Sequence, residues 1–453
     1  MLSTMRSRVL RPVLVLLAVA WPLAGSAAGA MPAAGATLAA GTTPASGLAG
    51  IRAAEMPALQ QIDVPAAWRA SGGKGVTVAV LDTGVDATAP DLAGQVITGP
   101  DYVAGVDPPG YKLPLKHGTY VASLIAGHGR GPGDTMGVIG VAPQARILSI
   151  RVIPDEGEPG VAAYHDEPKY ADALSEGIYS AVRDGAKVIN MSLSVQPGTG
   201  LRSMIAYAIT HGVVVVASAG DSGTASAFAP YLYPASFPGV IAVAAVNSAG
   251  TRAPFSQQNS SVVVAAPGVG VVGASPDGQY VDRDSTSSSA ALVSGVAALI
   301  LAKYPHLTPS AVEQAIVATT SHQPAGGYSV DTGFGEVNAA EALTAAPAYA
   351  AQDAAGADGV VVSGPGGRPL VTIPIPGLST TVSGRARLAR SLPPIVVTHR
   401  DEARIVAYGL IATVAAVLAA IALATMIVFT RRPRPRPTGL ELANMPPGDD
   451  LIS

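Results

Sequence analysis

Three side chains far apart in the chain could together perform nucleophilic catalysis, and Ser287 is the first of them. It lies in a Ser-rich turn that runs into the apolar segment 290–301, which predicts a buried helix. N–H groups in a first helical turn lack intrahelical partners, and the helix dipole there favours negative charge. A serine at this point could attack a carbonyl while backbone N–H groups hold the resulting oxyanion. A serine that only caps the helix gives the same local pattern, so both roles stay open here.

His117 and Asp82 supply the other two groups. Asp82 ends the apolar run 76–82 and is followed by Thr-Gly, and His117 begins the helix-like segment 117–126. A serine hydroxyl is a poor nucleophile until a histidine takes its proton, and the histidine needs a carboxylate to fix its tautomer. Taken singly, such an aspartate commonly caps a turn. The occurrence of all three residue types, in the order Asp, His, Ser, is much harder to attribute to chance.

The elements that must position these residues alternate along the chain. Apolar strand-like runs occupy 76–82, 146–153, 187–193, 213–217, 240–246 and 262–266, and helical segments lie between them at 117–126, 170–184 and 201–210. Continuous apolar strands that alternate with helices predict a parallel α/β sheet with helices on both faces. Ligands of such sheets bind beyond the carboxyl ends of the strands. Asp82 and Ser192 fall at strand ends of this kind.

These motifs resemble those of a known family. Val-Leu-Asp82-Thr-Gly, His117-Gly-Thr-Tyr-Val-Ala and Ser285-Thr-Ser287-Ser-Ser-Ala-Ala look like the three motifs of subtilisin-like serine proteases, which share the chain order Asp, His, Ser. The resemblance spans about residues 56–345. It implies a doubly wound parallel sheet and peptide-bond hydrolysis through an acyl-enzyme. It also implies the roles of Ser287 as nucleophile, His117 as base and acid, and Asp82 as the residue that orients His117.

The same resemblance extends to the substrate cleft. The stretch Asn190-Met-Ser-Leu-Ser194 is similar to the strand that lines the cleft in this family, which implies that Ser192, Leu193 and Ser194 pair with the substrate backbone as an added strand. No cofactor is implied. The acidic loop 154–168 contains no ligand pattern specific enough to assign calcium, and we expect no metal site.

Asp221 and Ser285 depart from the family pattern. The family usually has asparagine where Asp221 stands, and its amide donates to the oxyanion together with the backbone N–H of Ser287. An ionised carboxylate cannot donate, and only the protonated acid has an O–H to give. Loss of one such donor typically costs about 10²–10³ in turnover. The alternative is that Asp221 caps a turn and the Ser287 N–H serves alone. Where Ser285 stands the family usually has glycine, and a serine is awkward there if the backbone needs a positive φ.

Composition narrows the class of protein further. The chain has 453 residues, a formal net charge of -3 and no cysteine. Basic residues are not in excess, so the sequence does not indicate nucleic-acid binding. Without cysteine, thiol chemistry and disulfides are excluded, so the fold relies on core packing. The mean hydropathy of +0.37 is high for a soluble protein and suggests membrane segments.

The two ends account for this hydropathy. Three arginines precede the apolar run 12–24 and a stretch of small residues, which predicts a signal peptide at 1–30; an uncleaved anchor is the alternative. The uncharged segment 405–430 is long enough to span a bilayer, and four arginines follow it. The positive-inside rule places that flank, 431–453, in the cytoplasm. We therefore expect a single-pass protein of the cell membrane with its main domain outside the cell.

The resulting order of segments is a signal peptide, a disordered or extended segment at 31–55, a peptidase domain at 56–345, a Pro/Gly-rich spacer at 346–404, the membrane helix and a short tail. This order resembles the mycosins, membrane-anchored proteases of bacterial type VII secretion. The resemblance implies polypeptide substrates and components of the secretion complex as partners. Mycosins often carry disulfides, which this chain lacks. Two alternatives remain open: a weakly active or inactive protease-fold scaffold of the secretion complex, and a general surface subtilisin.

Overall fold

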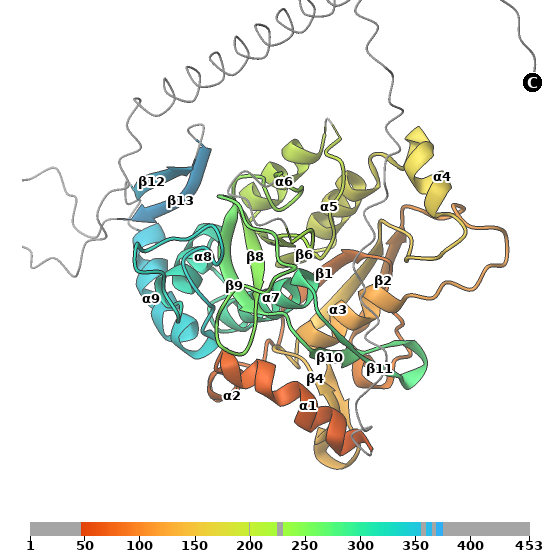
Figure 1. Cartoon of the computed structure of the whole chain (residues 1–453), viewed down its shortest axis with the longest axis horizontal. Coiled ribbons are helices and arrows are strands. Elements are labelled where there is room, and N and C mark those ends of the chain that lie inside the picture. The colour runs from red at the N-terminus through yellow and green to blue at the C-terminus, as the bar shows by residue number, and fades with distance from the viewer. Residues whose placement is uncertain (1–46, 199, 224–229, 355–358, 365–367, 375–453) are drawn as a thin grey trace, which may run out of the picture. The chain divides into compact units, whose positions relative to one another are not determined.

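A seven-stranded parallel sheet forms the centre of the molecule. The computed structural model describes residues 47–198, 200–223, 230–354, 359–364 and 368–374 (Figure 1). The strand order is β2-β5-β1-β6-β7-β8-β9. Their bounds are β1 Thr77–Asp82, β2 Val96–Asp101, β5 Arg146–Arg151, β6 Val188–Met191, β7 Val214–Ser218, β8 Val240–Val246 and β9 Val262–Pro267. Four of these strands, β6 to β9, are buried at every residue, as expected for a parallel sheet covered on both faces.

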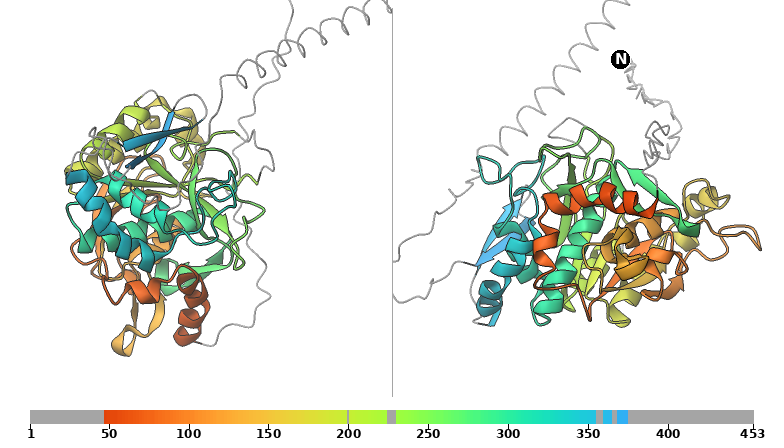
Figure 2. Two further views of the ribbon diagram at one scale, coloured as in Figure 1. Left: turned by 90° about the vertical axis from the view of Figure 1, so that its left-hand side faces the viewer. Right: turned by 90° about the horizontal axis from the view of Figure 1, so that it is seen from below.

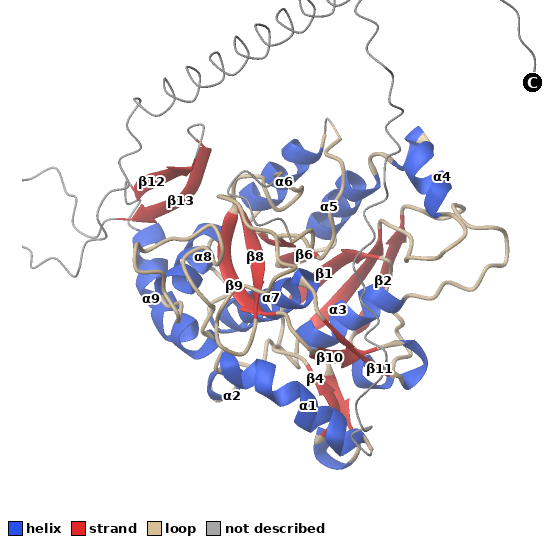
Figure 3. Cartoon of the chain, in the orientation of Figure 1, coloured by secondary structure: helices blue, strands red, loops and turns tan. Residues whose placement is uncertain are grey.

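Helices pack on both faces of this sheet (Figures 1 and 3). Helices α3 (Lys116–Ala126) and α7 (Thr286–Lys303) lie together on one face, and α5 (Ala173–Arg183) and α6 (Leu201–Thr210) lie together on the other. On the first face, Asn190 Nδ2 of β6 donates to Ser294 Oγ of α7 at 3.0 Å. On the second, Gly177 of α5 lies so close to the sheet that an added Cβ would be 2.6 Å from Val152. The doubly wound parallel sheet expected from the sequence is therefore confirmed.

The strand order brings the predicted site residues to one edge of the sheet. Strand β1 lies between β5 and β6, and β7 follows β6. All these pairs are parallel, so their carboxyl ends lie at the same edge. Asp82 is the last residue of β1, Ser192 follows β6 directly, and Asp221 lies three residues after β7.

The folded part begins earlier than the sequence indicated. Helix α1 spans Leu48–Gln61, so the segment expected to be disordered or extended through residue 55 is helical from Leu48. Arg52 Nε donates to the carbonyl of Gly137 at 2.9 Å, and a Glu55 oxygen accepts from the N–H of Ile139 at 2.8 Å. These bonds attach α1 to the hairpin of β3 (His128–Arg130) and β4 (Met136–Ile139). In Figure 2, α1 and the short α2 (Val64–Ala67) lie on the outside of the domain.

Several further elements differ from the sequence prediction. The acidic loop contains α4 (Val161–Asp166), and the expected spacer from residue 346 begins inside α9 (Ala339–Ala354). The runs β12 (Gly359–Gly364) and β13 (Arg368–Pro374) pair as an antiparallel hairpin.

The remaining elements are α8 (Pro309–Ala318), the hairpin of β10 (Val271–Ala274) and β11 (Tyr280–Arg283), and short 3₁₀ turns at Pro90–Leu92, Pro132–Asp134, Pro168–Tyr170 and Pro276–Gly278.

Among the described residues, one helix is long and apolar enough to cross a membrane, and it is α7. Its side chains are buried in the domain from Thr286 to Leu301, which identifies it as a core helix. The predicted signal peptide at 1–30, the membrane helix at 405–430 and the tail at 431–453 lie outside the described residues.

Candidate active site

Asp82 and His117 form a direct hydrogen bond. His117 Nδ1 lies 2.8 Å from Asp82 Oδ1, and the carboxylate is fully buried whereas 23% of the imidazole is exposed. Asp82 Oδ1 also accepts from the N–H of Thr83 at 2.7 Å. The Thr83 hydroxyl oxygen accepts in turn from the N–H of Gly118, directly after His117, at 3.0 Å. The end of β1 and the first turn of α3 are thus attached at two points, and these fix the imidazole against the carboxylate.

The surroundings raise the pKa of His117 above its ordinary value of 6.5. Burial acts to lower this pKa, but the negative charge of Asp82 and its hydrogen bond favour the imidazolium. Arg283 acts to lower the pKa, and Asp155 acts to raise it. The net direction is upward. The site therefore stabilises the protonated imidazole, which is the state that forms when a histidine accepts a proton from a nucleophile.

Asp155 is a residue of this site that sequence reasoning missed. Its carboxylate accepts from the N–H of Lys116 at 2.6 Å and from the N–H of His117 at 3.2 Å. Leu115, at the N-cap position of α3, provides no side-chain cap, so Asp155 caps the helix from 39 residues away in the chain. The signal that could have found it is an aspartate shortly after β5, at the same sheet edge as Asp82.

A buried ion network holds Asp155 in place. Glu158 Oε1 accepts from the N–H of Asp155 at 2.9 Å, and Glu158 Oε2 accepts from Arg151 Nη2 at 2.6 Å. The same guanidinium also contacts Asp101 and Asp107 at 3.2 Å each. Arg151 is 4% exposed, so its charge is balanced by these carboxylates and not by solvent.

Ser287 lies in the first turn of α7, where the sequence predicts it. Its hydroxyl donates to the carbonyl of Ser192 at 3.3 Å, and the Ser192 hydroxyl donates to the carbonyl of Ser287 at 3.1 Å. One residue further on, Ser288 Oγ lies 2.7 Å from the hydroxyl of Tyr120, which joins α7 to α3. Within the described residues no hydrogen bond joins Ser287 to His117. Proton transfer between them therefore requires Ser287 to turn from the Ser192 carbonyl toward the ring, and such bonds are often loose in unliganded enzymes.

Asp221 caps α7 and does not stand free. One carboxylate oxygen accepts from the N–H and the hydroxyl of Thr286 at 2.8 and 2.7 Å, and the other accepts from the Ser285 hydroxyl at 2.7 Å. The Ser285 oxygen accepts from the N–H of Ser287 at 3.0 Å. Ser285 has a φ of -163°, which is extended backbone that any residue adopts, so the concern about a positive φ there was wrong. Asp221 was considered either as an oxyanion donor or as a cap, and these contacts are those of a cap.

The predicted substrate-binding residues differ in exposure. The Ser192 side chain is buried and directed to Asn190 and α7, Leu193 is 7% exposed, and Ser194 is exposed. The next residue, Val195, already pairs with Tyr233 in an antiparallel bridge. Pairing of 192–194 with a substrate stays a prediction.

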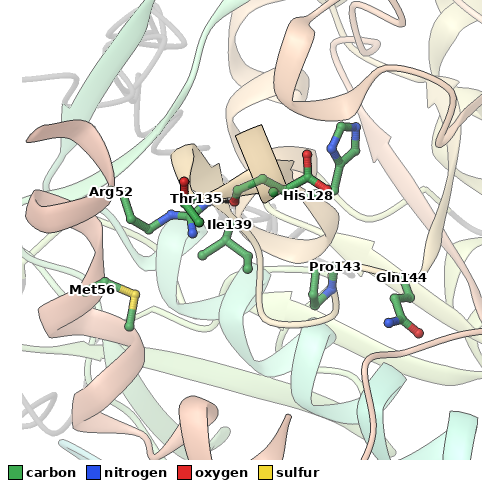
Figure 4. Close-up of a pocket in the computed structure, with 9 residues that line it drawn as sticks. Arg52, Met56, His128, Thr135, Ile139, Pro143 and Gln144 are labelled. Atoms are coloured by element: carbon green, nitrogen blue, oxygen red, sulfur yellow. Dashed lines mark hydrogen bonds between the residues drawn. The ribbon is translucent and has the colours of Figure 1, made fainter. Parts of the chain in front are cut away.

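A separate pocket of about 520 Å³ lies between α1 and the β3–β4 hairpin (Figure 4). Its lining includes Arg52, Met56, His128 and Ile139, and none of the predicted site residues. In the part of the chain that the structure describes, no group of three or more His, Asp or Glu side chains is placed to hold a metal ion.

The sheet topology, with an aspartate–histidine pair at its carboxyl edge and a serine at the start of a buried helix beside it, defines a serine peptidase of the subtilisin class. A family model described as the subtilase family matches residues 73–338, and the chain belongs to this family. It is a subtilisin-like serine endopeptidase.

Relatives and solved structures agree with this family. The chain is 36% identical over 266 residues to Subtilisin of Bacillus pumilus, covering 58% of this chain and 90% of the relative. It spans 65% of Subtilisin E of Bacillus subtilis. MycP1 from Mycobacterium smegmatis is similar in structure, with a TM-score of 0.53, 30% identity, and coverage of 63% of this chain and 84% of MycP1. MycP3 protease from the type VII (ESX-3) secretion system has a TM-score of 0.51 and 31% identity, with 63% and 87% covered.

Proposed function

We propose that this chain is a membrane-anchored extracellular endopeptidase that hydrolyses peptide bonds with Ser287, His117 and Asp82 and works with a type VII secretion system. The observation that carries the catalytic part is the 2.8 Å bond between His117 Nδ1 and the buried Asp82. It holds the imidazole with its Nδ1–H toward the carboxylate, which leaves Nε2 to accept a proton.

The mechanism follows from these positions. Ser287 Oγ attacks the substrate carbonyl carbon while its proton passes to His117 Nε2, and the carbonyl oxygen becomes an oxyanion. The imidazolium, stabilised by Asp82, then protonates the leaving amine, the peptide C–N bond breaks, and an acyl-enzyme on Ser287 remains. Water deprotonated by His117 attacks the acyl carbon, and His117 returns the proton to Ser287 as the new carboxylate leaves.

The cellular part of the proposal rests on the ends of the chain and on two similar structures. A signal peptide at 1–30 and a membrane helix at 405–430, followed by arginines, would place the peptidase domain outside the cell. The MycP1 structure is described as coming from the ESX-1 type VII secretion system, and the MycP3 structure as a protease from the type VII (ESX-3) secretion system. These similarities support secreted polypeptides as substrates and components of a secretion complex as partners.

A scaffold with weak or no turnover is the second candidate, because Asp221 replaces an oxyanion donor and Ser285 engages the Ser287 N–H. A general surface subtilisin is the third.

A fluorophosphonate probe tests the proposal on membranes that contain the full chain. We expect covalent labelling of Ser287 and none in Ser287→Ala, together with a secretion defect in a Ser287→Ala strain. Absence of labelling combined with normal secretion in that strain would instead favour the scaffold. Labelling combined with normal secretion would favour a general peptidase.

A further inference from the structure

The N–H of Ser287 is already engaged by the chain itself. In serine peptidases this N–H helps to bind the oxyanion that forms when the adjacent hydroxyl attacks a carbonyl. Donors hold such an oxygen at about 2.7–3.1 Å. Ser285 Oγ lies 3.0 Å from Ser287 N and accepts its hydrogen. The Ser285 hydroxyl therefore stands where the substrate oxygen would have to bind.

Asp221 holds the Ser285 hydroxyl in this position. The hydroxyl has one hydrogen, and it is donated to Asp221 Oδ2 at 2.7 Å. The carboxylate is itself anchored by the N–H and hydroxyl of Thr286. The Thr286 hydroxyl oxygen also accepts from the N–H of Gly220 at 3.1 Å. Ser285 is 9% exposed, so its two hydrogen bonds form largely away from water. Asp221 and Ser285, which both differ from the family pattern, are thus joined to each other by a hydrogen bond.

We propose that the Ser285 hydroxyl, held by Asp221, is an internal occupant of the oxyanion site that a substrate must displace before Ser287 can react. This inference rests on the proposed role of Ser287 as nucleophile. A serine side chain can leave by rotation about χ1 without movement of the backbone, since the extended backbone at Ser285 is unstrained. Substrate that binds strongly elsewhere in the cleft can drive this displacement, whereas a small reagent brings little binding energy to it and should react slowly.

The occupied site changes what is expected of Asp221→Asn. An asparagine at this position keeps an oxygen for Thr286, and its new N–H₂ group faces the Ser285 oxygen. The amide would then donate to Ser285 and not to a substrate oxygen. We therefore expect Asp221→Asn alone to gain little, and removal of the Ser285 hydroxyl to be the change that opens the site.

The test compares Asp221→Asn with the double variant Asp221→Asn/Ser285→Gly. Both variants lack the negative charge of Asp221, so they differ only in the Ser285 side chain. The measurement is the second-order rate of labelling of Ser287 by a small fluorophosphonate on the full chain. We expect the double variant to react about fivefold to tenfold faster, the factor by which one competing N-cap hydrogen bond reduces access. Glycine is itself a tolerated N-cap residue, so the double variant should still fold.

Thr308→Gly is the matched control. Thr308 caps α8 through a bond from the N–H of Ala311 at 3.2 Å, so this change also replaces an N-cap by glycine, but at another helix. We expect it to leave the labelling rate unchanged. A double variant that reacts no faster than Asp221→Asn, while both are labelled, would overturn the inference and leave the proposed function intact. If neither variant nor the parent is labelled, Ser287 is not the nucleophile, and both the function and the inference fall.

Discussion

Replacement of Asp155 tests whether the cap of α3 sets the reactivity of His117. The Asp155 carboxylate accepts from the N–H groups of Lys116 and His117, and its charge acts to raise the pKa of His117. Asp155→Asn removes the charge and keeps one of the two accepting oxygens, so most of the cap remains. Asp155→Ala removes both. The two variants therefore separate the electrostatic effect of Asp155 from its structural effect.

The structure gives the size of the structural effect. Hydrogen bonds to a charged group contribute about 1.5–3 kcal/mol, and loss of an N-cap costs about 0.5–2 kcal/mol. We expect Asp155→Ala to lower the free energy of unfolding by roughly 1–3 kcal/mol, a fall of roughly 2–6 °C in Tm for a domain of this size. Misplacement of a catalytic group by 1 Å can cost about 10², so the smaller shift expected here should lower kcat by about tenfold.

The pH dependence gives the electrostatic effect. His117 must be neutral to accept a proton, so kcat/KM rises as the pH rises through its pKa. The pKa of free His117 is raised by Asp82 and Asp155 and lowered by burial and Arg283. Loss of the Asp155 charge lowers this pKa. The acid limb of the kcat/KM profile should therefore move to lower pH in Asp155→Asn.

Arg283→Gln is the control of opposite sign. Arg283 acts to lower the pKa of His117, so its removal should move the acid limb to higher pH. The assay is kcat/KM for a fluorogenic peptide across the acid limb, with Tm measured for each variant. The reasoning is refuted if the acid limb of Asp155→Asn stays in place or moves to higher pH while Arg283→Gln behaves as expected.

Two further predictions concern buried charges. Arg151→Met should lower the free energy of unfolding, measured in urea, by about 3–5 kcal/mol, because it leaves buried carboxylates without their cation. Arg183→Met, at an exposed ion pair, should change this free energy little. Equal effects of the two substitutions would contradict this account. Burial raises the pKa of Glu313 from 4.5 to about 8. Its folded pKa exceeds its unfolded pKa, so its contribution to stability is present below pH 4.5 and is lost as the pH rises toward 8. Glu313→Gln should flatten the fall of Tm between pH 5 and pH 8, and a fall as steep as in the parent would refute the assignment.

The central sheet was predictable because its signal is local. The helix 201–210 and the strand 240–246 begin and end where the sequence indicates, since apolar runs of these lengths have few alternatives. Parallel topology then placed Asp82 and Ser192 at one edge. Helix α1 was missed because Ala and Gly dominate residues 47–54, and contacts of Arg52 and Glu55 with β4 hold it in place.

The electrostatics of the site were not predictable in the same way. Asp155 reaches the first turn of α3 from 39 residues away, and only the folded arrangement of β1, β5 and α3 brings the two together. The loop that carries it contains other acidic residues, so composition cannot select the one that caps the helix. Likewise, the sequence identifies Asp221 and Ser285 as unusual, but not that they are bonded to each other.

The first turn of α7 meets two demands that oppose each other. Stability favours acceptors for its free N–H groups, and Asp221 and Ser285 supply them for Thr286 and Ser287. Catalysis requires the Ser287 N–H to be available when an oxyanion forms. Without a cap, the Ser287 N–H is available to an oxyanion but the helix is less stable. With a cap, the helix is more stable but the cap must be displaced before the N–H can bind an oxyanion. In this chain the first turn of α7 is capped, so each substrate must displace the cap before Ser287 can react. The rate of hydrolysis should therefore depend on how much binding energy the substrate provides.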